Sequence, residues 1–234
     1  MARDPRKAQK AKERRNKRAK EKHKAAARLK STSPLALFDK LDGSVVTRCA
    51  VNDFMEEEGI TNLYVCREFP NGSAVVVCFL VDLFCLGVKD VMFEKTNVGG
   101  AVELYREVYK PSGPPRATTP AEAKKLCLGA VAFAAKYGLP PYPDYAQAVK
   151  IFDGIDETTC DTEFTFGKDG KPFYIVGPND GLTKRQRVID TLERTAGPGG
   201  YDFLFPIDAD FDDEFDDDGP PDGDEWTLPP RRKW

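Results

Sequence analysis

The polar residues that could carry chemistry lie in or beside the most apolar stretch of this chain, residues 74–93. Asp82 interrupts the stretch, and Lys89 and Asp90 follow a bend that Gly87 permits. Buried charges are usually paired or coordinated, and carboxylates bind hard cations such as Mg²⁺ through oxygen. Asp82, Lys89 and Asp90 are therefore candidate catalytic residues. They would serve a metal-dependent enzyme that acts on a phosphorylated or nucleic-acid substrate, with the two aspartates as ligands.

A second group of carboxylates lies in the predicted loop before residue 164. Such oxygen ligands could also hold a hard cation, but their spacing does not match an EF-hand. Acidic loops are commonly solvated, and an Asp within an apolar run commonly caps a turn or pairs with a nearby Lys. The solvated loop is therefore the stronger interpretation. The group consists of Asp153, Asp156, Glu157, Asp161 and Glu163.

Several common catalytic designs are excluded by the histidine and cysteine content. The single histidine, His23, lies in a charged N-terminal segment, so no histidine can relay a proton within the folded body, as Ser-His-Asp and Cys-His hydrolases require. The six cysteines show no C-x-x-C spacing, which argues against a zinc finger and a disulfide framework. Cys85 has apolar neighbours, which raise a thiol pKa, and no visible base. We expect buried reduced thiols and no cofactor.

Two turn segments have a polar character that suggests a ligand site. Residues 95–100 (KTNVGG) lead from a predicted strand into a predicted helix, a geometry that can hold an anion. The segment lacks the P-loop pattern G-x-x-x-x-G-K-[ST], so we interpret it as a plain turn. Residues 177–181 (GPNDG) are likewise interpreted as a turn that leads into a helix cap.

A block of positive charge occupies residues 1–30, which contain 14 Lys or Arg and 3 Asp or Glu, a net charge of +11. Such a block is typical of segments that bind polyphosphate. It has no aromatic residue for base stacking and no apolar face for a membrane surface. We therefore expect a non-enzymatic protein that associates with RNA, a ribonucleoprotein or DNA; a merely solubilising segment is the alternative. The expected phosphate contacts are Arg3, Arg6, Lys7, Lys10, Arg14, Arg15, Lys17 and Arg18.

The other end of the chain carries the opposite charge. Residues 202–225 contain 12 Asp or Glu and no Lys or Arg, with Phe211, Phe215 and Trp226 among or just after them. Acidic segments with aromatic residues dock on basic partners. A third possibility is therefore an interaction adaptor that uses this tail. We hypothesise that the tail occupies the basic arm, or a basic patch on a partner, and competes with nucleic acid.

The pattern of the middle of the chain predicts an α+β domain, a mostly antiparallel sheet packed by three or more helices and flanked by disordered charged tails. The predicted boundaries are residues 1–32 for the basic arm, 33–205 for the domain and 206–234 for the acidic tail. Asp82 and Lys89 interrupt the apolar stretch too early for a membrane span of roughly 20 residues. The N-terminus lacks the apolar region of a secretory signal, so we expect a reducing, cytoplasmic-type compartment and no membrane partner.

The expected elements follow from periodicity and punctuation. Thr119, Pro120 and Glu122 form a helix start with a capping box, and Thr183 with Gln186 caps the last helix. Asp169-Gly170 supplies the turn of a hairpin. The expected strands are 45–51, 60–69, 73–82 and 88–94, the hairpin is 164–176, and the helices are 53–58, 98–110, 119–137, 145–152 and 183–196.

Four segments together resemble a family of bacterial proteins to which no activity is attached. The resemblance covers residues 45–200, which agrees with the domain boundaries argued above, and it implies a single domain with variable tails. It implies no activity, cofactor or site residue. The segments are VVCFLVDLFCLGVKD (Val76 to Asp90), LCLGAVAFA (Leu126 to Ala134), PDYAQAV (Pro143 to Val149) and FGKDGKPFY (Phe166 to Tyr174).

Overall fold

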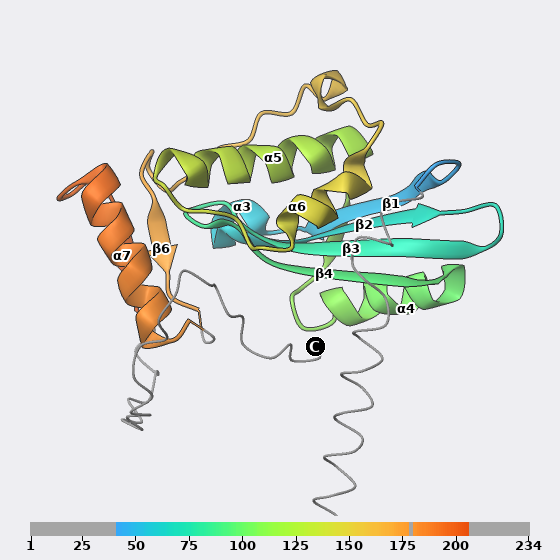
Figure 1. Cartoon of the computed structure of the whole chain (residues 1–234), viewed down its shortest axis with the longest axis horizontal. Helices are drawn as coiled ribbons and strands as arrows, with labels where there is room; N and C mark the ends of the chain where they lie inside the picture. Colours follow the sequence, from blue (N-terminus) through green and yellow to red (C-terminus); the bar gives the residue numbers. More distant parts are fainter. Residues whose placement is uncertain (1–40, 178–179, 206–234) are drawn as a thin grey trace, which may run out of the picture. The chain divides into compact units, whose positions relative to one another are not determined.

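The structure, a computed structural model, describes residues 41–177 and 180–205. The chain divides into two units, residues 1–42 and 43–234, and every element described below belongs to the second. Its main feature is a five-stranded antiparallel sheet in the order β4-β3-β2-β1-β5 (Figure 1). The strands are β1 (Val45–Asn52), β2 (Ile60–Glu68), β3 (Ser73–Asp82), β4 (Gly87–Asn97) and β5 (Pro115–Ala117).

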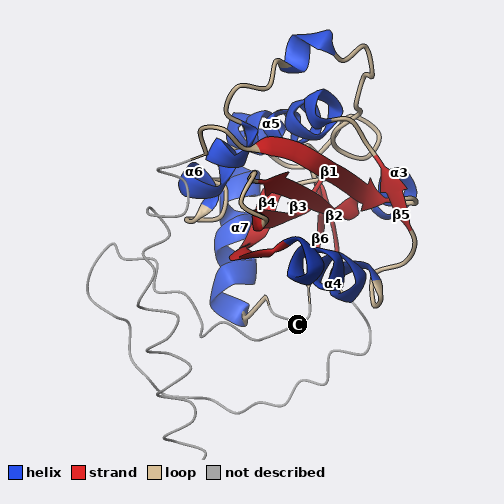
Figure 2. Cartoon of the chain, turned by 90° about the vertical axis from the view of Figure 1, so that its right-hand side faces the viewer, coloured by secondary structure: helices blue, strands red, loops and turns tan. Residues whose placement is uncertain are grey.

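Helices cover both faces of this sheet. α4 contacts β2, β3 and β4 on one face, and α5 contacts β1 to β4 on the other, where α6 also lies (Figures 1 and 2). The predicted α+β class, an antiparallel sheet packed by helices, is confirmed. The helices are α3 (Met55–Glu58), α4 (Val98–Tyr109), α5 (Pro120–Lys136), α6 (Tyr145–Ala148) and α7 (Leu182–Ala196), with the 3₁₀ turns η1 (Val149–Phe152) and η2 (Glu157–Thr159).

The centre of the sheet is β3, which pairs along its whole length with β2 and β4. Its residues are almost all buried, because helices cover both faces. Alternate residues of the strand serve the two faces. Val76 packs against α4 in a cluster with Tyr64 and Ala101, whereas Phe79 stacks on Phe152 of η1. A continuous β-branched and aromatic sequence therefore suits this position, since both faces of the strand are dry.

The predicted hairpin at residues 164–176 is only partly correct. Asp169 and Gly170 both have positive φ, and Lys168 forms a bridge with Lys171, so the turn exists. The segment before the turn, however, forms no strand. β6 (Phe173–Ile175) instead pairs in parallel with β7 (Asp202–Leu204) in a separate two-stranded sheet. In the sequence, α7 separates β6 from its partner strand β7. A local turn pattern therefore does not predict this pairing.

Two predicted helix caps differ in outcome. The Thr119 side chain accepts a hydrogen bond from the Glu122 N–H at 3.1 Å, as expected, while the Glu122 carboxylate pairs with Arg116 instead of closing a capping box. The cap predicted at Thr183 is wrong. The N-cap of α7 is Gly181, which offers no side chain, and Thr183 lies inside the first turn.

The charged ends lie outside the described residues, so the arm, the tail and the domain boundaries at 32/33 and 205/206 stay predictions. All six cysteines fall inside the described range; none is in a disulfide, and five are buried. Within residues 41–177 and 180–205, no helix has the length and apolar character needed to cross a membrane.

Gly87 lies at the start of β4, where α5 approaches the backbone closely. Its φ is +66°, and an added Cβ would lie 3.0 Å from the Ala130 carbonyl oxygen and 3.2 Å from Val131 Cα. Gly72 has a similar φ of +78° with no atom within 4 Å. Left-handed backbone costs a non-glycine residue about 1–2 kcal/mol. Gly87→Ala should therefore destabilise by that amount plus about 1–3 kcal/mol of overpacking, and Gly72→Ala by the first amount alone.

Urea unfolding of both variants measures this difference in free energy of unfolding. Equal losses for the two variants would mean that α5 does not constrain the β4 start.

Candidate functional site

Asp82 closes the connection between the two central strands. Its Oδ1 accepts hydrogen bonds from the backbone N–H of Phe84 at 3.0 Å and of Cys85 at 2.9 Å. An aspartate that bonds to backbone groups two and three residues ahead builds a local turn. The residue is 5% exposed. Asp82, a sequence candidate for metal binding, therefore uses one carboxylate oxygen to hold the turn that leads to Gly87 and Lys89.

Burial decides how Asp82 titrates. Desolvation raises the pKa of its carboxyl from 3.8 to about 6, although Lys89 and the backbone N–H groups of Phe84, Cys85 and Leu86 act in the opposite direction. The charged form is thus stabilised by hydrogen bonds but remains costly in this dry position. Asp82 can take up or release a proton not far below neutral pH.

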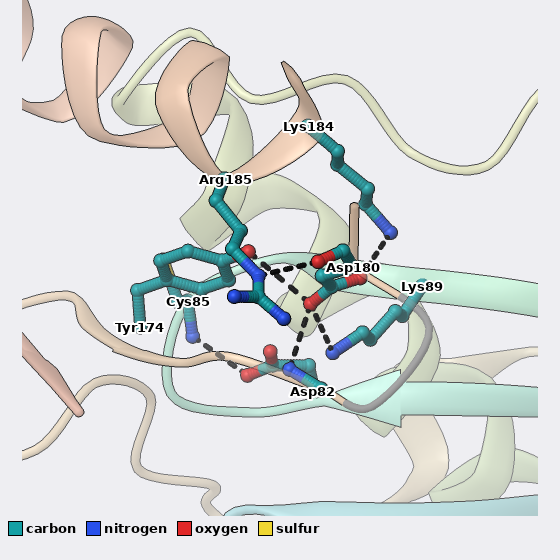
Figure 3. A network of polar contacts seen from close by, with 8 residues as sticks. Asp82, Cys85, Lys89, Tyr174, Asp180, Lys184 and Arg185 are labelled. Atoms are coloured by element: carbon teal, nitrogen blue, oxygen red, sulfur yellow. Dashed lines mark hydrogen bonds and ion pairs between the residues drawn. The ribbon is translucent and has the colours of Figure 1, made fainter. Parts of the chain in front are cut away.

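Lys89 contacts a residue that the sequence analysis did not select. Its Nζ lies 3.1 Å from Oδ2 of Asp180, and the two side chains are 12% and 2% exposed (Figure 3). Asp180 belongs to the GPNDG segment that we interpreted as a simple turn. A buried ion pair requires further hydrogen bonds to offset desolvation, and Asp180 has them.

Four further groups surround Asp180. Lys184 Nζ lies 2.8 Å from Oδ1, the backbone N–H of Gly177 donates to Oδ2 at 2.9 Å, and the Tyr174 hydroxyl donates to Oδ2 at 3.2 Å. The Arg185 Nε donates to the backbone carbonyl oxygen of Asp180. Burial opposes ionisation of Asp180, but Lys184, Lys89 and Gly177 outweigh it and lower its pKa. Asp180 therefore stays ionised at neutral pH.

The network joins parts of the chain that are distant in sequence. Lys89 comes from β4, Tyr174 from β6, and Lys184 and Arg185 from the first turn of α7 (Figure 3). Behind it, Cys85, Tyr174 and Leu192 belong to one buried apolar cluster. The arrangement fastens α7 and β6 to the end of the central sheet. Chemically, it can exchange a proton at Asp82 while Asp180 stays ionised.

Asp90 occupies a different position from Asp82 in the ladder between β3 and β4. Its Oδ1 accepts from the backbone N–H of Val91 at 2.8 Å, and in the ladder it is opposite Leu80, whereas Asp82 is opposite Gly87. Across the described part of the chain, no group of three or more His, Cys, Asp or Glu side chains is arranged to hold a metal ion. Asp82 and Asp90 are therefore not brought together with a third ligand there.

The second acidic group has structural contacts of its own. Asp156 caps η2, accepting from the Thr158 N–H at 3.0 Å and hydroxyl at 2.6 Å, and these bonds lower its pKa. Glu157 pairs with Lys124 of α5 at 2.8 Å, and its pKa is also lowered. Glu163 pairs with Lys125 at 2.8 Å. The backbone carbonyl of Asp153, rather than its carboxylate, accepts a hydrogen bond from Arg67.

The Cys85 thiol and an open hollow near α3 are two further features of the body. Burial and the charge of Asp82 raise the pKa of the Cys85 thiol and outweigh Lys89, which lowers it, so the thiolate is disfavoured. An open hollow of about 430 Å³ near α3 shares no residue with the Asp180 network. The hollow is lined by Asp53, Met55, Glu56, Glu57, Arg116, Glu122, Thr162 and Phe164.

Comparisons of the chain with protein-family models, with curated proteins and with solved structures gave no match. The function must therefore be argued from the residues of this chain.

The sequence offered only a weak indication of the Asp180 network. The indication is that Lys184 follows Asp180 at i,i+4, a spacing that can bring opposite charges together at the start of a helix. The contribution of Lys89, 91 positions earlier, follows from the fold alone.

Asp82→Asn should change how stability depends on pH. The raised pKa means that the folded protein binds a proton that the unfolded chain releases between about pH 4 and 6. Asp82 therefore contributes a stability that is lost as pH rises through this window, on the order of 3 kcal/mol for a shift from 3.8 to about 6. Asparagine retains the oxygen that accepts from Phe84 and Cys85 but does not ionise.

Urea unfolding at pH 4, 5, 6 and 7 measures the free energy of unfolding of both proteins. The value for the variant should rise relative to that of the natural protein as pH rises. Asp169→Asn, in an exposed turn at positive φ, is the control. Stability curves of Asp82→Asn that run parallel to those of the natural protein would contradict the assignment.

Asp180→Asn should destabilise the protein by about 3–5 kcal/mol, the usual cost of breaking a buried pair, because it leaves Lys89 without its counter-ion. Asp190→Asn in α7 is the control, since Asp190 is exposed and accepts a hydrogen bond from Gln186. A change within about 0.5 kcal/mol is expected for an exposed site. Thermal and urea unfolding measure both, and similar small losses would show that the network is not structural.

Proposed function

We propose that this protein associates with RNA or DNA through its basic arm, residues 1–30, and does so without catalysis. The observation that carries the proposal is the net charge of +11 in those 30 residues. Each phosphate that Lys or Arg neutralises releases a counter-ion, which drives binding without sequence recognition. The absence of aromatic residues from the arm favours contact with phosphates over stacking on bases.

The charge of the folded body supports giving this role to the arm. Residues 41–205 contain 17 Lys or Arg and 23 Asp or Glu, a net charge of −6. A body with this charge repels a polyphosphate at long range. Binding to nucleic acid would therefore depend on the arm. The arm would tether the α+β body to the nucleic acid.

The contacts of the body favour the same division of roles. Lys89, Lys124 and Lys125 are each paired with a carboxylate of the body. The metal-dependent enzyme alternative rests on Asp82 and Asp90, and Asp82 already holds two backbone N–H groups. We therefore propose the arm, rather than a site on the sheet, as the functional element.

Fluorescence anisotropy with a generic single-stranded RNA and a duplex DNA, over a series of salt concentrations, tests the proposal. For duplex DNA, eight phosphate contacts predict a slope of about −7 for log K against log salt. A variant with Gln at the eight arm positions should lose most of this binding. The eight positions are Arg3, Arg6, Lys7, Lys10, Arg14, Arg15, Lys17 and Arg18.

The matched control exchanges Lys and Arg at the same eight positions. It keeps every charge, so its affinity should stay close to that of the natural chain, because contacts driven by counter-ion release depend on charge. Binding that survives the Gln variant, or no binding by the natural chain, would refute the proposal.

A further inference from the structure

The last described strand leads the chain back to the Asp180 network. β7 runs parallel to β6, and the backbone N–H of Val176 donates to the Leu204 carbonyl oxygen at 3.1 Å. Val176 is followed by Gly177, whose N–H is bonded to Asp180. The chain therefore leaves β7 at Phe205 beside the loop that holds Asp180 and the start of α7.

Exposed apolar side chains gather at this exit. Leu182 is 73% exposed at the first position of α7, and Phe203 and Phe205 of the β7 end are 47% and 43% exposed. The two phenylalanine rings lie 5.1 Å apart in an edge-to-face contact. Within the described residues, β7 pairs with β6 and with no other strand. We call Leu182, Lys184, Arg185, Phe203 and Phe205 the exit surface.

Two cationic side chains also belong to the exit surface. Lys184 and Arg185 lie in the first turn of α7, which contains no acidic residue, although the positive end of a helix dipole favours one. The Lys184 side chain pairs with the Asp180 carboxylate and is 39% exposed, whereas the Lys89 side chain, which pairs with the same carboxylate, is only 12% exposed. Arg185 donates to the backbone carbonyl oxygen of Asp180. The exit surface is thus apolar and cationic, which fits an acidic ligand with large apolar side chains.

A segment of that chemistry begins three residues after Phe205. Residues 208–218 (DADFDDEFDDD) contain eight acidic residues, no Lys or Arg, and Phe211 and Phe215 spaced by four. Residues 206 and 207 lead directly into it, and a short tether raises the local concentration of a ligand to the millimolar range. Charge complementarity and the exit point of the chain therefore favour this segment over a separate molecule.

We propose that residues 208–218 of the acidic tail dock in the same molecule on the exit surface, with their carboxylates beside Lys184 and their phenylalanines against Leu182, Phe203 and Phe205. The docked tail covers exposed apolar side chains and brings further carboxylates beside Lys184, whose ammonium group also pairs with Asp180. The docking site for the tail is therefore on the folded body and not on the basic arm. The proposal does not depend on nucleic-acid binding.

Zero-length carbodiimide cross-linking of the full chain, read by mass spectrometry, tests this directly. An equal mixture of ¹⁴N- and ¹⁵N-labelled protein separates links within one molecule from links between two. We expect an amide link within one molecule between Lys184 and a carboxylate of residues 208–218. It should be lost at about 1 M salt, where the screening length falls to about 3 Å. Lys110, exposed at the end of α4, provides the background level.

Variants in the tail leave the described body unchanged and test the apolar contact. Phe211→Ser with Phe215→Ser keeps every carboxylate and should abolish the Lys184 link. Trp226→Ser, which lies beyond the docking segment, is the matched control and should retain it. Leu182→Ser removes the exposed partner and should weaken the link. A Lys184 link no stronger than that of Lys110, or one found only between differently labelled molecules, overturns the proposal; the second result assigns the surface to another copy.

Discussion

β3 runs through the middle of the sheet with both edges hydrogen-bonded and both faces covered by helices, and most of the remaining structure depends on that burial. At roughly 25 cal/mol per Å² of apolar surface removed from water, a strand of this composition is a strong source of stability. The same dryness governs its polar end. Asp82 must satisfy its carboxylate locally, so the chain turns at once, and Gly87 lets β4 start under α5.

The two buried aspartates illustrate how surroundings decide protonation. Asp82 is desolvated and has one lysine charge at a distance, so burial prevails and its pKa rises. Asp180 is also buried, but two ammonium groups and a backbone N–H contact it directly, so attraction prevails and its pKa falls. Lys89 acts on both carboxylates. The network consequently holds Asp180, whose pKa is lowered, next to Asp82, whose pKa is raised to about 6, at the junction of β4, β6 and α7.

Charge is unevenly distributed along this chain. The folded body has a net negative charge, with Lys89, Lys124 and Lys125 in ion pairs, whereas the arm concentrates positive charge and the tail concentrates negative charge. Long-range attraction to polyphosphate and local docking on an apolar, cationic surface are different physical demands. The two proposals assign these demands to opposite ends of the chain, outside the sheet, whose stability rests on burial.

The sequence by itself determined the elements that local physics controls. The apolar run bounded by turn residues predicted β3 at residues 73–82 correctly, and the helix-start pattern at Thr119 predicted the start of α5, because strand burial and capping act within a few residues. The sequence also determined the charge blocks. Only the tertiary structure decided that β6 pairs with β7, and that Lys89 and Asp180 form a buried pair. Those contacts join segments about 30 and 90 residues apart, and what selects them is the packing of α7 against the end of the sheet, which no local pattern encodes.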